Sequence, residues 1–458
     1  MIFILYFEIA FSYNSVSTKA ELKGGWQLSG QNKNNKAKEG VGKMAKIKKG
    51  LSYETVLVML FFVAWGFLYL DRQAISMLMP FIIEDIALTN TKIGQINMWQ
   101  TIGFALAAPT FAILSDRLGH KKTILFWAMI VTSVLALLTM FAETYTYMLI
   151  VRTLLGASEG VILPISLSLL ASVSRPTTLG RNMGLVYAGA AVIGVTIGPL
   201  VVTQLGELFG WRYAFLFVSI PSFIVALLML RFVKPPEAVV KTEAVTAFNV
   251  STIYNSVKNR NILICILISI FCMGAMWTFN AFLPLYLTQV SLLSITQMGM
   301  VFSLFGLLTI IWQVFIPYSS DKIGRKPAMT GYLAMAMATP LVLFFFPQSA
   351  VSLVVLVLLG GIILAMNTLY QSIIPVESVP IAVMATANAL IMGIGELVGA
   401  FSIGLSGVLA DSFGLTAVMV VIPISYLIAF LISFGLIETL KGKATRKKPA
   451  LVEVPTET

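Results

Sequence analysis

The stretch that decides the fold is SDRLGHKK, residues 115–122, which joins two long apolar runs. A related stretch, SDKIGRK, follows 205 positions later at residues 320–326, again between apolar runs. A second pair of landmarks has nearly the same offset, because ELFG at 207–210 is echoed by DSFG at 411–414. Two landmarks that share one offset indicate that a unit of the chain is duplicated.

The composition places this duplicated chain in lipid. Of 458 residues, 58% are hydrophobic and 11% are charged, and the mean hydropathy is +0.90. A soluble domain has about 25% charged residues, and soluble cores cannot hide so much apolar surface. About twelve runs reach the ~20 apolar residues that a spanning helix needs, near 53–79, 92–114, 122–142, 145–173, 181–204, 213–232, 260–287, 296–318, 327–346, 350–373, 382–409 and 415–437. We therefore predict an all-α integral membrane protein, with about twelve transmembrane helices in two pseudo-symmetric six-helix bundles.

The connectors between these runs alternate in charge. Basic residues gather in every second connector and at both flanks, within residues 43–49, 117–122, 175–181, 231–260, 322–326 and 441–448. The intervening connectors hold only Lys92 and Arg212 as cations. By the positive-inside rule, both termini are predicted to be cytoplasmic, in a plasma membrane. The net charge of +11 is assigned to this topology, with anionic lipid head groups and not nucleic acid as the partner.

The charge pattern also sets the predicted segments. They are a tail at 1–50, a first bundle at 51–232, a cytoplasmic linker at 233–258, a second bundle at 259–438 and a basic tail at 439–458. The first tail is polar after its opening apolar residues and is expected to be disordered. Residues 1–43 are interpreted either as a mis-called start upstream of Met44 or as a dispensable tail.

The residue inventory argues against an enzyme. The chain has one histidine, His120, and its two cysteines, Cys265 and Cys272, lie in an apolar run without metal-ligand spacing. Catalysis by a histidine triad or a zinc site is therefore excluded. No P-loop pattern occurs, so ATP is not expected to drive the protein, and no cofactor is predicted.

The loop at 115–122 resembles the signature loop of the major facilitator superfamily, with its weaker echo at 320–326. Ser115 and His120 depart from the usual Gly and Arg of that signature. The resemblance implies two halves that rock around a substrate site near the membrane midplane. It also implies gating roles in the two loops, for Asp116, Arg117, Gly119, Asp321, Lys322, Gly324 and Arg325. The alternative is that these residues are only topogenic charges around a turn.

A few charged residues lie inside the apolar runs, where each costs at least ~2.5 kcal/mol on insertion scales. They are Asp71, Arg72, Arg152, Glu159 and Glu396. A guanidinium suits a carboxylate ligand, so Arg72 is the predicted anion anchor. Desolvation disfavours a charged carboxyl, so Glu159 is the predicted proton carrier, with Arg152 on the same helix face and Asp71 and Glu396 as further candidates. The alternative is a static network that only fixes helix packing; for Glu396 it is a neutral carboxyl in packing.

Three local patterns resemble the anion:cation symporter branch of that superfamily: YLDR at 69–72, RTLLGASEG at 152–160 and GWRYAF at 210–215. Leu68 departs from the Asn that often precedes the tyrosine. The branch implies proton-coupled uptake of a small organic anion, such as a sugar acid or another carboxylate, by a protein expected to act as a monomer. The predicted substrate contacts are Arg72, Tyr69, Trp277, Asn280, Asn367 and Gln371, with Gln313, Tyr286 and Tyr370 as further candidates. The alternative function is a proton-driven multidrug or metabolite exporter, although Arg72 would repel cationic cargo.

Overall fold

The computed structural model describes residues 52–175, 178–234, 258–379 and 381–440, apart from the side chains of 116, 117, 381–383 and 385. Within these residues every regular element is helical, and twelve helical spans are long and apolar enough to cross a membrane. The predicted all-α membrane fold is confirmed. The predicted tail at 1–50, most of the linker at 233–258 and most of the tail at 439–458 lie outside the described residues.

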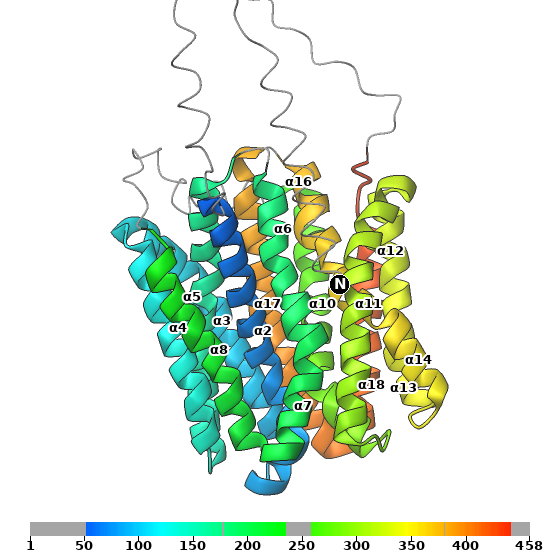
Figure 1. Ribbon diagram of the computed structural model, residues 1–458. Coiled ribbons are helices and arrows are strands. Elements are labelled where there is room, and N and C mark those ends of the chain that lie inside the picture. The colour runs from blue at the N-terminus through cyan, green and yellow to red at the C-terminus, as the bar shows by residue number, and fades with distance from the viewer. Residues whose placement is uncertain (1–51, 176–177, 235–257, 380, 441–458) are drawn as a thin grey trace, which may run out of the picture. The chain divides into compact units, whose positions relative to one another are not determined.

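The first half contributes six spans, seen from blue to green in Figure 1. They are α2 (Tyr53–Ile86), α3 (Asn90–Leu118), α4 (Lys121–Leu138) continued by η2 (Thr139–Phe141), α5 (Tyr145–Val173), α6 (Leu179–Gly189) continued through η3 (Ala190–Ile197) into α7 (Gly198–Phe209), and α8 (Trp211–Phe232).

The second half contributes the other six spans, with α12, α13 and α14 on the side of Figure 1 opposite α4, α5 and α8. They are α10 (Arg260–Gln289), α11 (Ile295–Ile323), α12 (Arg325–Ala336) with α13 (Ala338–Phe345), α14 (Ala350–Leu359) with α15 (Gly361–Ala365), η4 (Leu369–Ile373) and α16 (Ile374–Ser378), α17 (Ile381–Phe413), and η5 (Leu415–Ala417) with α18 (Val418–Ser433).

In both halves the duplicated landmarks end a helix at a glycine with positive φ. Gly119 and Gly324 follow α3 and α11 with φ of 69° and 109°, and Gly210 and Gly414 follow α7 and α17 with φ of 82° and 84°. Glycine adopts this left-handed region without the steric cost of a Cβ. The repeat that is visible in the sequence is thus a repeat of helix ends.

The first span is longer than the apolar pattern predicts, because α2 runs to Ile86 rather than to about residue 79. Its end carries two acidic residues, Glu84 and Asp85, and is anchored by α8: the Asp85 carboxylate accepts a hydrogen bond from Trp211 Nε1 at 3.1 Å and pairs with Arg212. Hydropathy marks where lipid ends and not where a helix ends. As a result Arg72 lies near the middle of α2.

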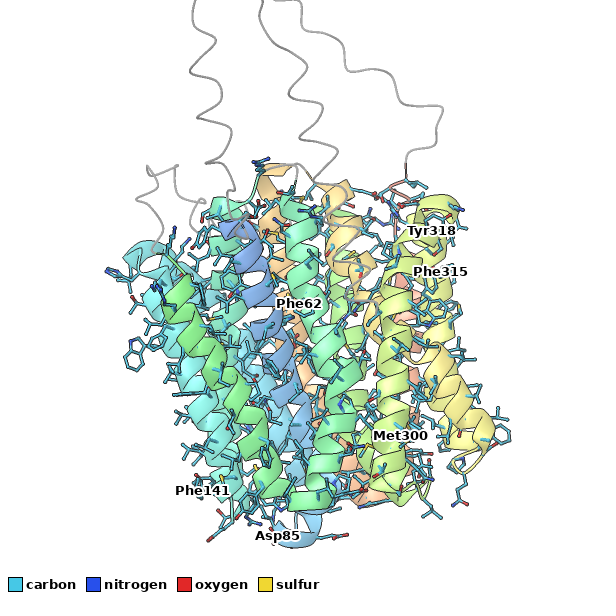
Figure 2. The ribbon with its side chains drawn as sticks, viewed as in Figure 1. Phe62, Asp85, Phe141, Met300, Phe315 and Tyr318 are labelled. Carbon is cyan, nitrogen blue, oxygen red and sulfur yellow. The ribbon has the colours of Figure 1, made fainter. Side chains whose placement is uncertain are left out.

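The two ends of the helices differ in charge. We call the end with Asp85, Glu207 and Asp411 the acidic end, and the end with Lys121, Lys322 and Lys326 the basic end. In Figure 2, Asp85 marks the acidic end at the bottom and Tyr318, next to Lys322, lies near the basic end at the top.

Two carboxylates at the acidic end join the halves, and we call them the paired caps. Asp411 at the end of α17 accepts hydrogen bonds from the backbone N–H groups of Asn90 and Thr91, both at 2.8 Å, where α3 begins. Glu207 at the end of α7 accepts from the backbone N–H of Thr296 at 2.9 Å, where α11 begins, and from its hydroxyl. The first N–H groups of a helix lack intrahelical partners and favour negative charge. Each half therefore caps a helix of the other half.

At the basic end, Arg325 and Glu438 form a network within the second half. Arg325 pairs with Asp321 at 2.6 Å and with Glu377 at 2.8 Å, and Glu438 accepts hydrogen bonds from the backbone N–H groups of Arg325 and Lys326. Burial acts to raise the pKa of the Glu438 carboxyl, but these amides and that of Leu440 outweigh burial and lower the pKa below its ordinary value. Glu438 thus stays charged and caps α12.

Large apolar side chains cover the outside of the helices. Phe141, Met300, Phe315 and Tyr318 project outward in Figure 2 and are about half exposed. Such a surface is unsuited to water and suited to lipid tails. The protein is a multi-pass membrane protein.

Candidate functional site

Five charged side chains are buried at mid-helix depth in the described part of the chain. The first half supplies Asp71 and Arg72 from α2 and Arg152 and Glu159 from α5, and the second half supplies Glu396 from α17. All five are at most 8% exposed. Burying so many charges is costly unless they are paired or serve a function, so their partners decide what the site can do.

Arg152 and Asp71 form a pair within the first half. Arg152 Nη1 lies 3.7 Å from Asp71 Oδ2 and donates to the Asp71 carbonyl at 3.4 Å. The guanidinium also lies over the Phe215 ring, 4.6 Å from its centroid. The α5 backbone also packs closely on α3. At Gly156 of α5, an added Cβ would overlap the Gln100 carbonyl of α3.

Arg72 lies where the two halves meet. Its guanidinium is held between two rings, 3.9 Å from the centroid of Trp277 on α10 and 4.6 Å from that of Phe104 on α3. Arg72 Nη2 donates to Thr101 at 3.3 Å and lies 4.0 Å from Glu396 Oε2. The same Oε2 accepts a hydrogen bond from Trp277 Nε1 at 2.8 Å. Cation–π contact and ion pairing thus fix the guanidinium from both halves.

Two cavities share Arg72. We call the first the polar cavity, because it is lined by uncharged polar side chains beside Arg72: Gln73, Ser76, Asn97, Gln100, Thr101 and Asn280. We call the second the aromatic cavity, because Trp65, Tyr69 and Phe104 line it with Leu68 and Glu159. A ligand at Arg72 would therefore meet amides and hydroxyls on one side and rings on the other.

Glu159 differs from Asp71 and Glu396 because no ion pair of its carboxyl is found in the described residues. It is 2% exposed, and neither carboxyl oxygen has a hydrogen-bond partner in the described residues. A carboxylate in this position would lack compensation for its lost hydration, so the protonated form is favoured. The site can therefore hold a proton beside Arg72.

The halves also touch through a pair of amides next to Arg72. Gln73 Nε2 donates to Asn280 Oδ1 at 3.0 Å, and Asn280 Nδ2 donates to the Met276 carbonyl at 2.9 Å. Gln100, on the opposite wall of the polar cavity, is 2% exposed, and its Nε2 has no hydrogen-bond partner in the described residues. An unpaired buried donor is costly, and a ligand in the cavity would satisfy it.

Of the predicted substrate contacts, the structure brings Tyr69, Arg72, Trp277 and Asn280 together around the two cavities. Asn367 and Gln371 do not line them. The two amides contact methionine sulfurs of α10, with Asn367 Nδ2 3.3 Å from Met276 Sδ and Gln371 Nε2 3.2 Å from Met273 Sδ.

The further candidates also lie elsewhere. Tyr370 donates to Asn367 at 2.5 Å, Tyr286 donates to the Leu343 carbonyl at 2.6 Å, and Gln313 is exposed on α11.

Sequence analysis missed the polar lining that α3 supplies. Asn97, Gln100 and Thr101 interrupt an apolar run at a spacing of three and four residues. Such residues share one face of a helix. This spacing was the available signal. Gln73 gives no separate signal in the sequence, because it directly follows the charged residue Arg72.

The structure describes more side chains in the second of the two predicted gating loops than in the first. Asp321 pairs with Arg325 inside its own loop, and Lys322 Nζ lies 4.4 Å from the centroid of the Tyr318 ring. Gly119 and Gly324 make the predicted turns with positive φ. The side chains of Asp116 and Arg117 lie outside the described residues, so their proposed gating role stays a prediction.

Comparison with known families places this architecture. The sequence profile of the Major Facilitator Superfamily matches residues 61–403 and, in a second match, residues 293–455. The chain belongs to the Major Facilitator Superfamily. A crystal structure of a bacterial homologue of the human lysosomal transporter Spinster, inward-facing and unoccupied, superposes with a TM-score of 0.73 at 15% identity, over 84% of this chain and 98% of that one. This likeness supports the superfamily fold.

Two curated superfamily members illustrate the range of relatives. A hexuronate transporter of Bacillus subtilis is 29% identical over 288 residues, covering 60% of this chain and 67% of its own. The multidrug resistance protein MdtG of Proteus mirabilis is also 29% identical, but over 215 residues, covering 45% of this chain and 52% of its own. The relatives are transporters and not enzymes, so the chain is a membrane transporter for small molecules.

Proposed function

We propose that the protein is a proton-coupled symporter that takes up a small organic anion, with a sugar acid such as a hexuronate as the favoured class. The observation that carries this proposal is Arg72, a cation at the contact between the halves, shared by two cavities. A guanidinium keeps its charge and offers a planar fork to a carboxylate. The amides of the polar cavity suit the hydroxyl groups of a sugar acid.

Transport would proceed by alternating access. The paired caps tie the halves at the acidic end. With the basic end in the cytoplasm, as the positive-inside rule indicates, the paired caps would form the outer gate, which is closed in this arrangement. Both termini would then be cytoplasmic, and the protein would work in the plasma membrane as a monomer with lipids around it.

The proton coupling is assigned to the first half. Glu159 lies in the aromatic cavity beside Arg72 without a hydrogen bond of its own, and Arg152 and Asp71 form the neighbouring pair. A proton on Glu159 would accompany the anion through the closed state and leave when the cavity opens to the cytoplasm. The remaining question is whether a proton gradient drives the anion.

Uptake into proteoliposomes tests the proposal. The purified full-length chain is offered labelled hexuronates, an aldonate, an aromatic acid and phosphate, with and without an inward proton gradient, and a lipophilic cationic dye is offered in parallel. We expect one of the carboxylates to be accumulated only with the gradient. Gradient-driven movement of the dye without any carboxylate would instead support the exporter that the similarity to MdtG suggests.

A further inference from the structure

Glu396 is the carboxyl that the second half presents to Arg72. It is 4% exposed, its Oε2 lies 4.0 Å from Arg72 Nη2, and the same oxygen is held by Trp277 Nε1 at 2.8 Å. We propose that Glu396 occupies the anion position of Arg72 in the unloaded transporter, and that an entering organic anion displaces it as one proton binds to Glu396. This inference rests on the proposed role of Arg72 as the anion anchor.

The geometry around Arg72 makes Glu396 and a substrate compete. The guanidinium carbon lies 3.9 Å from the Trp277 ring centroid and 4.6 Å from that of Phe104, so rings occupy part of its surroundings. Nη2 already faces Glu396 and Thr101, and a carboxylate that binds this nitrogen must compete with them. Two carboxylates beside one guanidinium in a dry site repel each other strongly.

Charge counting leads to the same conclusion. The buried mid-helix set holds two cations, Arg72 and Arg152, and three carboxyls. Asp71 pairs with Arg152 and Glu396 faces Arg72, which leaves Glu159 without a partner in the described residues. With Glu159 protonated, the unloaded site is neutral. An added organic anion makes it negative, and one further proton restores neutrality, which favours uptake of one proton from the medium for each anion bound.

Protonation would leave the Glu396 side chain in place. A protonated carboxyl still accepts a hydrogen bond, so Trp277 Nε1 keeps its partner, while the attraction to Arg72 is lost. The freed edge of Arg72 can then receive the carboxylate of the substrate. Glu396 thus becomes a neutral neighbour of Arg72.

Few other titratable groups face Glu396 in the described residues. Its electrostatic neighbours besides Arg72 are Tyr69 of α2 and Tyr370 of η4. The other elements packed on α17 bring uncharged Thr101 and Gln100 from α3, the buried thiol of Cys272 from α10, Tyr426 from α18 and, at the basic end, Glu377 of α16, which pairs with Arg325; η5 brings no titratable side chain. Phenols and thiols are neutral near pH 7, so Arg72 is the charge that Glu396 senses.

Calorimetry on the full-length protein in detergent tests this linkage, with D-glucuronate as the probe. Titration in two buffers of different ionisation heat gives the number of protons bound with each anion. For the wild type we expect about one proton, and a Kd that weakens about tenfold per pH unit on the alkaline side. Glu396→Gln, which keeps an acceptor for Trp277, should bind without proton uptake and with a Kd independent of pH. Glu84→Gln is the matched control, because Glu84 is exposed near the end of α2 and lines neither cavity, and it should keep the wild-type linkage.

The outcomes separate this inference from the proposed function. If Glu396→Gln binds D-glucuronate with the wild-type proton uptake, the inference is wrong and the anion transporter stands. If the wild type binds no D-glucuronate, the hexuronate assignment fails, and a substrate-free measurement decides on Glu396. In that measurement, the fluorescence of the wild type minus that of Trp277→Phe should change with pH and lose the change in Glu396→Gln. A Trp277 signal that does not respond to pH, or that still responds in Glu396→Gln, overturns the inference.

Discussion

The two halves of the chain share duplicated helix ends, but they bring different chemistry to the centre. In the first half, α2 and α5 carry Asp71, Arg72, Arg152 and Glu159 at mid-helix. The equivalent spans of the second half, α10 and α14 to α16, have charged residues only at their ends, Arg260 and Glu377. The cation and the ring that meet at the centre, Arg72 and Trp277, are 205 positions apart and so occupy equivalent places in the repeat.

This difference indicates a division of labour. The helix ends are duplicated in the two halves, whereas the centre is free to diverge because no turn or cap depends on it. Under the proposed function, the first half would recognise the anion and balance its charge. The second half supplies a ring, an amide and one carboxyl. The predictions below test this division, beginning with the largest expected effect.

The strongest test of charge balance in the first half is Glu159→Gln. The amide resembles the protonated carboxyl, so this variant should still bind the organic anion and exchange it across the membrane. It should accumulate the anion less under a pH gradient, because only the proton taken up at Glu396 would then travel with the anion. Counterflow and gradient-driven uptake, measured on the same proteoliposomes, separate the two activities. Undiminished accumulation would place coupling elsewhere, on Glu396 or Asp71, or leave the first-half network a packing device.

Arg72→Lys tests recognition of the anion by the first half. The charge remains but the planar fork and its stacking between Trp277 and Phe104 are lost. A charge-assisted hydrogen bond contributes about 1.5–3 kcal/mol, so we expect Kd to rise about 10- to 100-fold, with normal membrane insertion. Equilibrium binding in detergent measures it. Wild-type affinity would show that Arg72 is not the anchor.

Two asparagine variants test how the second half contributes to binding of the anion. Asn280→Ala removes a wall of the polar cavity and the partner of Gln73, and a neutral hydrogen bond is worth about 0.5–1.5 kcal/mol. Anion affinity should fall about two- to tenfold. Asn367→Ala is the matched control, because Asn367 contacts methionine sulfurs and lines neither cavity, and its affinity should stay within about twofold. A larger loss for Asn367→Ala would move the site toward η4.

The smallest effects concern the paired caps, where the halves are alike. Asp411→Asn and Glu207→Gln each remove one charge from a helix start, worth about 0.3–1 kcal/mol. Each should therefore shift the balance toward opening of the acidic end by about two- to fivefold. Spin labels at the exposed positions Phe141 and Val351, one in each half, report the opening as a longer distance; the native cysteines are buried.

Asp85→Asn serves as the control for the caps, because Asp85 binds Trp211 and Arg212 inside the first half. It should leave the distance distribution unchanged. Unequal shifts in the two cap variants would show that the repeat does not extend to the gate.

Much of the fold was available from the sequence, for reasons that particular residues make clear. Lipid demands long apolar helices, so hydropathy located the twelve spans, and the offset between Asp116 and Asp321 revealed the repeat. The end of α2 was not predictable, because Asp85 extends the helix through contacts with α8, which lies far along the chain. A helix end that carries acidic residues and is held by tertiary contacts cannot be located from the hydropathy pattern.

The site was only partly predictable. Charges in apolar runs are so costly that the sequence alone identifies the five central residues, Asp71, Arg72, Arg152, Glu159 and Glu396. Which of them pair depends on how the helices are rotated. The pairing of Gln73 with Asn280 spans 207 positions, and the turn of Asn367 toward Met276 depends on packing that no local pattern encodes. Glu207 and Asp411 were noticed as landmarks of the repeat, and only the structure shows them crossing between the halves.

The crossing of the paired caps has a kinetic consequence. Because Glu207 reaches from the first half to the second and Asp411 reaches back, neither half can tilt away at the acidic end without breaking both ties in the same event. The caps belong to separate helix pairs, so their free-energy contributions should add. The rate of outward opening in a double variant should therefore rise by the product of the two single-variant factors. Such an arrangement would suppress partial openings, which in a carrier would be leaks. Both caps would have to break together before a proton could cross the membrane without its anion.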